Sequence, residues 1–172
     1  YRFLDDVDHV VPLLVTEALT RLGPHTPPRP GGPVEQRIAD LVAFRTGFWI
    51  EAEHYVEMVI HYAPVSTFAA DFVEGAQRTL RATIEEVFAD KLARLDPGAR
   101  VLAAAGVEAS VSFLVIAVLH NRLGATPAEA SAVMARMVRS ALTAPGPMPS
   151  LPEAVDEHKP GFVRPPEPSR QG

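Results

Sequence analysis

Apolar residues recur at intervals of three and four along most of this chain, which is the spacing of one face of an α-helix. Proline and glycine mark the places where the pattern pauses. This division predicts helical segments over residues 6–22, 33–62, 67–95, 97–123 and 126–142. The second segment contains Gly47, so it could instead be two helices that meet near residues 47–53. No convincing strand pattern is present, and the sequence therefore predicts an all-α bundle of five to six helices.

Two helix starts carry clear capping signals. Asp96 precedes Pro97, and Thr126 precedes Pro127, which in both cases places proline in the first turn behind an N-cap side chain. Glu129 lies three residues after Thr126 and completes a capping box. We therefore expect helices to begin at these two points.

The chain is divided by proline-rich stretches. Most of its 17 prolines lie in two patches, residues 24–33 and 145–168. We expect one helical domain over residues 1–143 and a proline-rich tail over residues 144–172. The tail is expected to pack along its own or a partner's last helix through its apolar residues Met148, Leu151, Val155 and Phe162.

Composition narrows the possible classes of protein. The 172 residues include no cysteine and carry a formal net charge of −5. This excludes disulfide scaffolds and thiol chemistry, and it argues against a basic body that binds nucleic acid. No signal-peptide pattern is visible, so we expect a cytoplasmic protein. The apolar run Val101–Leu119 is almost long enough to cross a membrane, but Glu108 in its middle favours a core helix.

The sequence contains no recognisable catalytic or phosphate-binding motif. His54, Glu57 and His61 could share one helix face, and Glu51 and Glu53 lie beside them. Such a group could bind a metal or support acid–base catalysis, but polar residues at a half-exposed helix edge are the preferred interpretation. We expect no enzymatic activity, no metal and no cofactor.

Aromatic residues are concentrated in the second segment and continue into the third. Such a cluster is either ordinary core or the wall of an apolar pocket that carries a few polar groups. Arg45 lies between Leu41 and Phe48 on the apolar face, where it needs an internal carboxylate or an anionic ligand. The internal carboxylate is the preferred interpretation. The candidate ligand-binding residues are Phe44, Arg45, Phe48, Trp49, Tyr55, Met58, Tyr62, Phe72 and Phe113.

Two short motifs resemble the TetR-type transcriptional regulators. The chain opens with Tyr1-Arg2-Phe3-Leu4, followed by acidic residues and Val10-Val11, which is similar to the end of that family's DNA-binding domain. Leu4 departs from the pattern, since the family usually has Phe there. The stretch 121–130 is similar to the turn between the family's last two long helices. The resemblance spans about residues 1–143, and residues 1–5 would be a remnant of the DNA-binding domain.

The resemblance implies a bacterial repressor that forms a homodimer and binds a small hydrophobic or amphipathic effector. Its helix-turn-helix would precede Tyr1, so DNA would be bound only through a domain absent from this chain. The last two long helices of each subunit would form a four-helix bundle, and the effector would lie among the first four segments. The expected dimer-interface residues are Val111, Val115, Val118, Met134, Met137, Val138 and Ala141.

Two other functions stay open from the residues alone. A structural dimer or adaptor would have a filled core and no ligand. A helical enzyme, the less favoured alternative, would use residues 45–61 and would need their carboxylates and imidazoles to converge in a cleft.

Overall fold

The computed structural model of the protein describes residues 2–22 and 26–143, and within them every regular element is helical. The all-α prediction is therefore confirmed. The tail and its four apolar residues lie outside the described residues. In chain order the elements are α1 (Arg2–Leu22), α2 (Val34–Tyr62), α3 (Thr67–Val87), α4 (Ala89–Leu92), α5 (Pro97–Ser110), α6 (Phe113–Ala117), the π-helical turn η1 (Val118–Arg122) and α7 (Pro127–Leu142).

Three of the five predicted segments differ from the observed helices: α1 begins at Arg2 instead of residue 6, the third segment is divided at Phe88, and the fourth is divided as well. The second segment is one unbroken helix of 29 residues, and Gly47 does not interrupt it. The segment expected to end at Leu123 is instead broken at residues 111–112. There the Ser112 hydroxyl accepts a hydrogen bond from the Val115 amide and begins a new helix. A local capping bond therefore overrides a continuous apolar pattern.

Both predicted capping sites are confirmed. The Asp96 carboxylate accepts a hydrogen bond from the Ala99 amide at 2.9 Å and begins α5. Thr126 and Glu129 form a complete capping box at the start of α7. These bonds satisfy amide groups that a helix start otherwise leaves without a partner.

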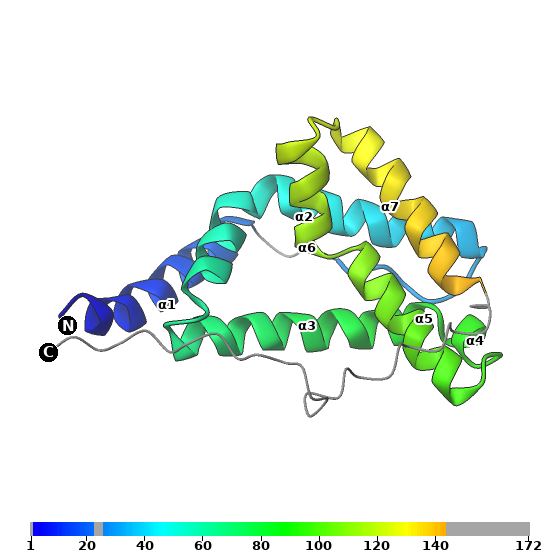
Figure 1. Cartoon of the computed structure of the whole chain (residues 1–172), viewed down its shortest axis with the longest axis horizontal. Helices are drawn as coiled ribbons and strands as arrows, with labels where there is room; N and C mark the ends of the chain where they lie inside the picture. The colour runs from blue at the N-terminus through cyan, green and yellow to red at the C-terminus, as the bar shows by residue number, and fades with distance from the viewer. Residues whose placement is uncertain (1, 23–25, 144–172) are drawn as a thin grey trace, which may run out of the picture.

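The helices surround a core on the right of the molecule and extend from it to the left (Figure 1). α7 packs against α5 and α2, and α3 packs against α2 and α5. α1 lies on α2 and α3 at the other end. The main core contains fully buried side chains from each of the central helices: Ile38, Leu41, Ile84, Phe88, Val107, Val111, Met134 and Val138.

Arg37 holds the break between α3 and α4. Its guanidinium donates hydrogen bonds to the Val87 carbonyl oxygen and, at 2.6 Å, to the Asp90 carboxylate. It also lies 5.7 Å from the centre of the Phe88 ring. Arg37 is buried, whereas the Asp90 side chain is half exposed, and Arg37 lowers the pKa of Asp90 through this bond. Arg37 therefore satisfies a carbonyl group that the end of α3 leaves free, and Asp90 balances its charge.

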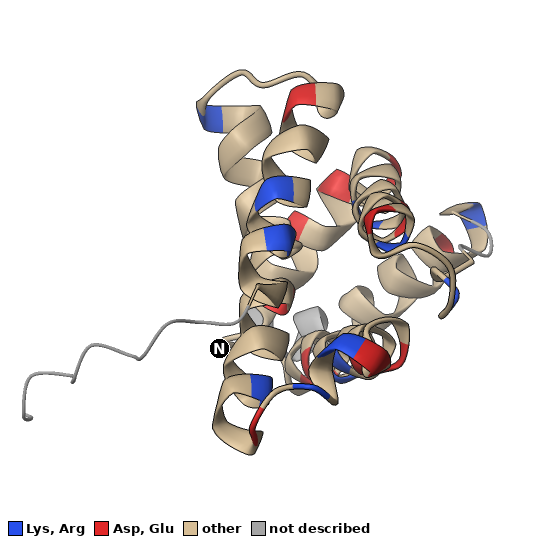
Figure 2. Cartoon of the chain, turned by 90° about the vertical axis from the view of Figure 1, so that its right-hand side faces the viewer, with Lys and Arg blue, Asp and Glu red and all other residues tan. Residues whose placement is uncertain are grey.

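Charged residues are spread over several helices, and both signs are visible on the side shown in Figure 2. Cross-helix ion pairs join Arg81 of α3 to Glu108 of α5 and Arg139 of α7 to Glu35 of α2. Such partly exposed pairs contribute little to stability.

Candidate functional site

Arg45 of α2 lies against the junction of α5 and α6. Its Nε donates a hydrogen bond to the Val111 carbonyl oxygen at 3.0 Å. Its guanidinium carbon lies 3.9 Å from the centre of the Phe113 ring. The Phe113 ring is in turn 5.7 Å from the rings of both Phe48 and Trp49. The structure therefore brings together four of the nine residues predicted to bind a ligand.

The break between α5 and α6 creates this arrangement. Val111 ends α5, and the extended backbone of Ser112 turns the chain before α6 begins. An uninterrupted helix would use the Val111 carbonyl within its own hydrogen-bond ladder. Here that carbonyl accepts from Arg45 instead, and Phe113 is placed against α2. The sequence pattern did not locate this junction because Ser110 and Ser112 lie within a long, mostly apolar stretch.

Arg45 has no carboxylate partner among the described side chains, those of residues 9–22 and 26–143. Its bonds are to a backbone carbonyl and an aromatic face, neither of which carries a negative charge. Burial lowers the pKa of Arg45 to about 10, and no neighbouring charge opposes that shift. Arg45 therefore stays protonated at neutral pH. The preferred sequence-based interpretation, an internal carboxylate, is wrong for the described residues.

The two terminal nitrogens of Arg45 remain accessible. Within the described part of the chain, the buried side-chain nitrogens that lack a hydrogen-bond partner are Arg37 Nε and Trp49 Nε1. Arg45 is partly buried and is not among them, although no described residue accepts a hydrogen bond from its terminal nitrogens. Those nitrogens can therefore meet solvent or a ligand.

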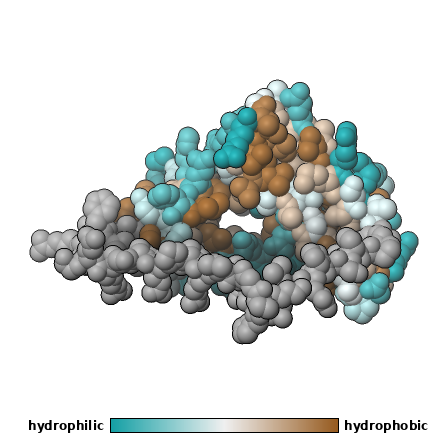
Figure 3. All heavy atoms as spheres, in the orientation of Figure 1, coloured by the Kyte–Doolittle hydropathy of each residue, from teal (hydrophilic) through white to brown (hydrophobic). Residues whose placement is uncertain are grey.

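The space-filling view shows an opening through the molecule (Figure 3). Comparison with the ribbon in the same orientation places it between α2 and α6 on one side and α3 and α5 on the other. Apolar residues gather along part of its rim (Figure 3). We call this opening the central hollow. It lies among the helices where the sequence analysis expected an effector.

Three other predicted ligand residues pack against the small core that supports α1. Met58, Tyr62 and Phe72 pack around a second, smaller core that contains Val11 and Val15 of α1. These three residues come from α2 and α3, the helices that also border the central hollow. The helices against which α1 packs are therefore the same helices that border the hollow.

The remaining two predicted residues lie apart from Arg45. The Tyr55 hydroxyl interacts with Arg21 near the end of α1 and, after Glu17, helps to raise the pKa of Arg21. Phe44 is partly buried on α2. Tyr55 lies two turns beyond Phe48 along α2, and its contact is with α1 rather than with the group around Phe113.

A separate small pocket lies on the other side of Trp49. Its volume is about 130 Å³, which is below the usual range for a drug-sized ligand. It is lined by residues of α2, α6, η1 and α7: Thr46, Trp49, Ile50, Glu53, Ile116, His120, Pro127 and Ala130. The sequence analysis did not anticipate this pocket, since it depends on how η1 turns back toward α7.

The polar group on α2 does not converge on a common point. Glu57 accepts a weak 3.4 Å hydrogen bond from Asn121, and His61 packs edge-on against Tyr62. His54 is exposed. Among the described residues no group of three His, Asp or Glu side chains is placed to hold a metal ion.

The predicted interface residues fall into two sets. Val111, Met134 and Val138 are completely buried within the chain, so in this structure they offer no surface to a partner. Val115, Val118 and Ala141 are partly buried, and Met137 is 37% exposed. The helical spacing could not separate Met134 from Met137, because both belong to the broad apolar stripe of α7.

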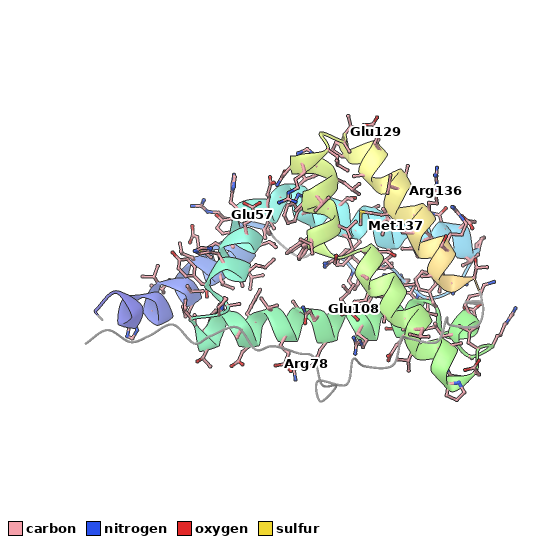
Figure 4. All side chains as sticks on the ribbon, viewed as in Figure 1. Glu57, Arg78, Glu108, Glu129, Arg136 and Met137 are labelled. Atoms are coloured by element: carbon pink, nitrogen blue, oxygen red, sulfur yellow. The ribbon has the colours of Figure 1, made fainter. Side chains whose placement is uncertain are left out.

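An exposed apolar surface runs beside the buried set. On α5 the positions Leu102, Ala105, Gly106 and Ala109 repeat at helical spacing, and they are exposed or partly exposed. Gly106 lets α5 approach α7 closely, since a Cβ added there would lie 3.0 Å from the Ala141 Cβ. We define the α5–α7 face as Leu102, Ala105, Gly106, Ala109, Val133 and Met137. Apolar residues also gather over α6 and η1 in Figure 3, and Figure 4 labels Met137 on α7.

The stretch Pro97–Arg122 is long and apolar enough to cross a membrane by length and composition alone, and an 18-residue window within it has a mean hydropathy of 2.2. A core helix of a soluble protein passes the same test, so this is weak evidence for a membrane. The stretch includes the break at residues 111–112 and contacts α7, α3 and α2.

Comparison with protein families, curated proteins and solved structures finds no match for this chain.

Proposed function

We propose that this chain is the effector-binding and dimerisation part of a ligand-responsive transcriptional repressor resembling the TetR type. The effector would occupy the central hollow, and the α5–α7 face would pair with a second copy. DNA would be bound by a domain that precedes α1 in the whole protein, in the cytoplasm. The chain would have no enzymatic role.

One observation carries this proposal. The residues that support α1, Met58, Tyr62 and Phe72, belong to the same two helices that border the central hollow. A molecule in the hollow would therefore displace the side chains that support α1, the helix that leads toward the DNA-binding domain. Packed helices shift as units because close-packed interiors do not deform smoothly.

The mechanism would be a shift between two conformations. An effector can move that equilibrium only as far as its affinities for the two conformations differ. Occupation of the hollow would favour a position of α1 in which the two DNA-binding domains of a dimer no longer match their operator. The α5–α7 face would hold the dimer together in both states.

Filling the hollow is expected to change hydrogen exchange in α1. With N-phenyl-1-naphthylamine as a neutral apolar probe, amides of residues 9–22 should exchange at least about threefold more slowly, since their supporting side chains lose freedom. Hydrogen–deuterium exchange with mass spectrometry measures this. Residues 89–96, at the opposite end of the molecule in Figure 1, serve as the internal control and should not change.

Two outcomes would contradict the proposal. Protection confined to residues 116–130 would place the probe in the small pocket near η1 instead. An absence of saturable binding would favour a structural dimer or adaptor, whose core has no room for a ligand.

A further inference from the structure

We infer that the effector is an organic anion, an aromatic or apolar carboxylate or sulfonate, whose acidic group binds the terminal nitrogens of Arg45 where α2 meets the junction of α5 and α6, helices that border the central hollow. This inference rests on the proposed function and names the chemical class of the ligand. It assigns the charge-recognising role to Arg45 and the contact with the apolar body to Phe48 and Phe113.

No described residue supplies a counter-charge to Arg45. Arg45 is a partly buried cation whose described contacts are the Val111 carbonyl and the Phe113 ring. A buried charge is normally paired. The nearby carboxylate of Glu108 on α5 accepts hydrogen bonds from Arg81 at 2.8 and 3.0 Å (Figure 4 labels Glu108). The missing counter-charge therefore has to come from outside the described residues.

Two contacts hold the Arg45 guanidinium in place. Nε is committed to Val111 at 3.0 Å, and the guanidinium carbon lies 3.9 Å from the centre of the Phe113 ring. These two contacts fix the guanidinium while its terminal N–H groups stay free. A guanidinium held in this way is preorganised to bind two oxygens of an acidic group through two parallel hydrogen bonds.

Two aromatic rings near Arg45 offer a surface for the apolar body of the ligand. Phe48 and Phe113 are partly exposed, and their rings are nearly parallel, with an interplanar angle of 22°. An apolar wall beside one fixed cation is the usual composition of a site for an amphipathic small molecule. A neutral apolar ligand would leave Arg45 without a counter-charge, and an inorganic anion would leave the wall unused.

Two dyes that share one ring system separate these contributions. 1-Anilinonaphthalene-8-sulfonate carries an acidic group, and N-phenyl-1-naphthylamine has the same rings without it. Fluorescence titration of the full chain gives a Kd for each. In Arg45→Gln we expect the Kd of the sulfonate to rise at least about tenfold, the usual cost of losing a charge-assisted bond. The Kd of the neutral dye should change less than about twofold, since its apolar contacts remain.

The choice of variants isolates the role of Arg45. Glutamine keeps an N–H donor for the Val111 carbonyl, so it removes the charge while preserving the contact between helices. Arg78→Gln makes the same change in net charge on α3, where Arg78 is 73% exposed and projects below the helix in Figure 4. It should leave both Kd values unchanged.

A test on the unaltered chain does not depend on the folding of any variant. 1-Naphthoate should displace the neutral dye with at least about tenfold higher affinity than 1-naphthamide, which has the same shape without the charge.

The outcomes separate the inference from the proposed function. If the neutral dye binds but the sulfonate is insensitive to Arg45→Gln, or the amide competes as well as the naphthoate, the anion inference is overturned and effector binding stands. If Arg45→Gln raises the Kd of both dyes equally, Arg45 only joins helices, and the inference is also overturned. If neither dye binds with saturation, the inference and the proposed function fail together.

Discussion

Met134→Ala is expected to lower the free energy of unfolding by about 2–5 kcal/mol, because it empties a fully buried volume. Met134 is 0% exposed and belongs to the main core, between α2, α5 and α7. The loss combines the transfer of the side chain from water with the cavity that remains. Chemical denaturation followed by circular dichroism measures it.

Met137 provides a matched control on the same helix. It lies one turn away and is 37% exposed, so Met137→Ala should cost less than about 1 kcal/mol in an isolated subunit. If Met134→Ala has no effect, α7 does not face the core as described. The assignment of the α5–α7 face would then be wrong as well.

Ala105→Glu combined with Met137→Glu is expected to convert the proposed dimer into a monomer. Both positions lie on the α5–α7 face, and both are exposed in the single chain. Glutamate is a good helix former, so the fold of each subunit should persist. Two carboxylates per subunit, buried against their symmetry mates, would cost several kcal/mol, which is enough to separate the subunits at micromolar concentration.

Sedimentation velocity at several concentrations measures this change. Ala82→Glu is the matched control, because it adds the same side chain at an exposed position of α3. It should leave the sedimentation coefficient unchanged. A double variant that still sediments as a dimer would show that the subunits join through another surface, with the apolar residues over α6 and η1 the next candidate.

Periodicity and capping were sufficient to predict the helical class and the main helix starts. Asp96 and Thr126 act through contacts three residues away, and such local signals can be recognised in a sequence. The break at residues 111–112 could not be foreseen in the same way. Its cap, Ser112, lies inside an apolar run, and its effect depends on α2 receiving Phe113.

For the site, too, the sequence identified a residue from its neighbours along the chain but not the contacts it makes with other helices. The sequence identified Arg45 as a cation on an apolar face and left two partners open. Distinguishing them required knowing that Glu108, the carboxylate of the neighbouring helix, is engaged with Arg81 of α3. Similarly, the apolar stripe of α7 contains both Met134 and Met137, and only the packing of α5 near Gly106 shows which of them is covered.

Native mass spectrometry of the purified chain tests the central claim most directly. The account predicts a species of about 37.2 kDa, twice the subunit mass of 18.6 kDa, that gains the mass of one 1-anilinonaphthalene-8-sulfonate per subunit when the dye is added. A monomer of 18.6 kDa at low micromolar concentration that takes up no dye would contradict both dimerisation and effector binding.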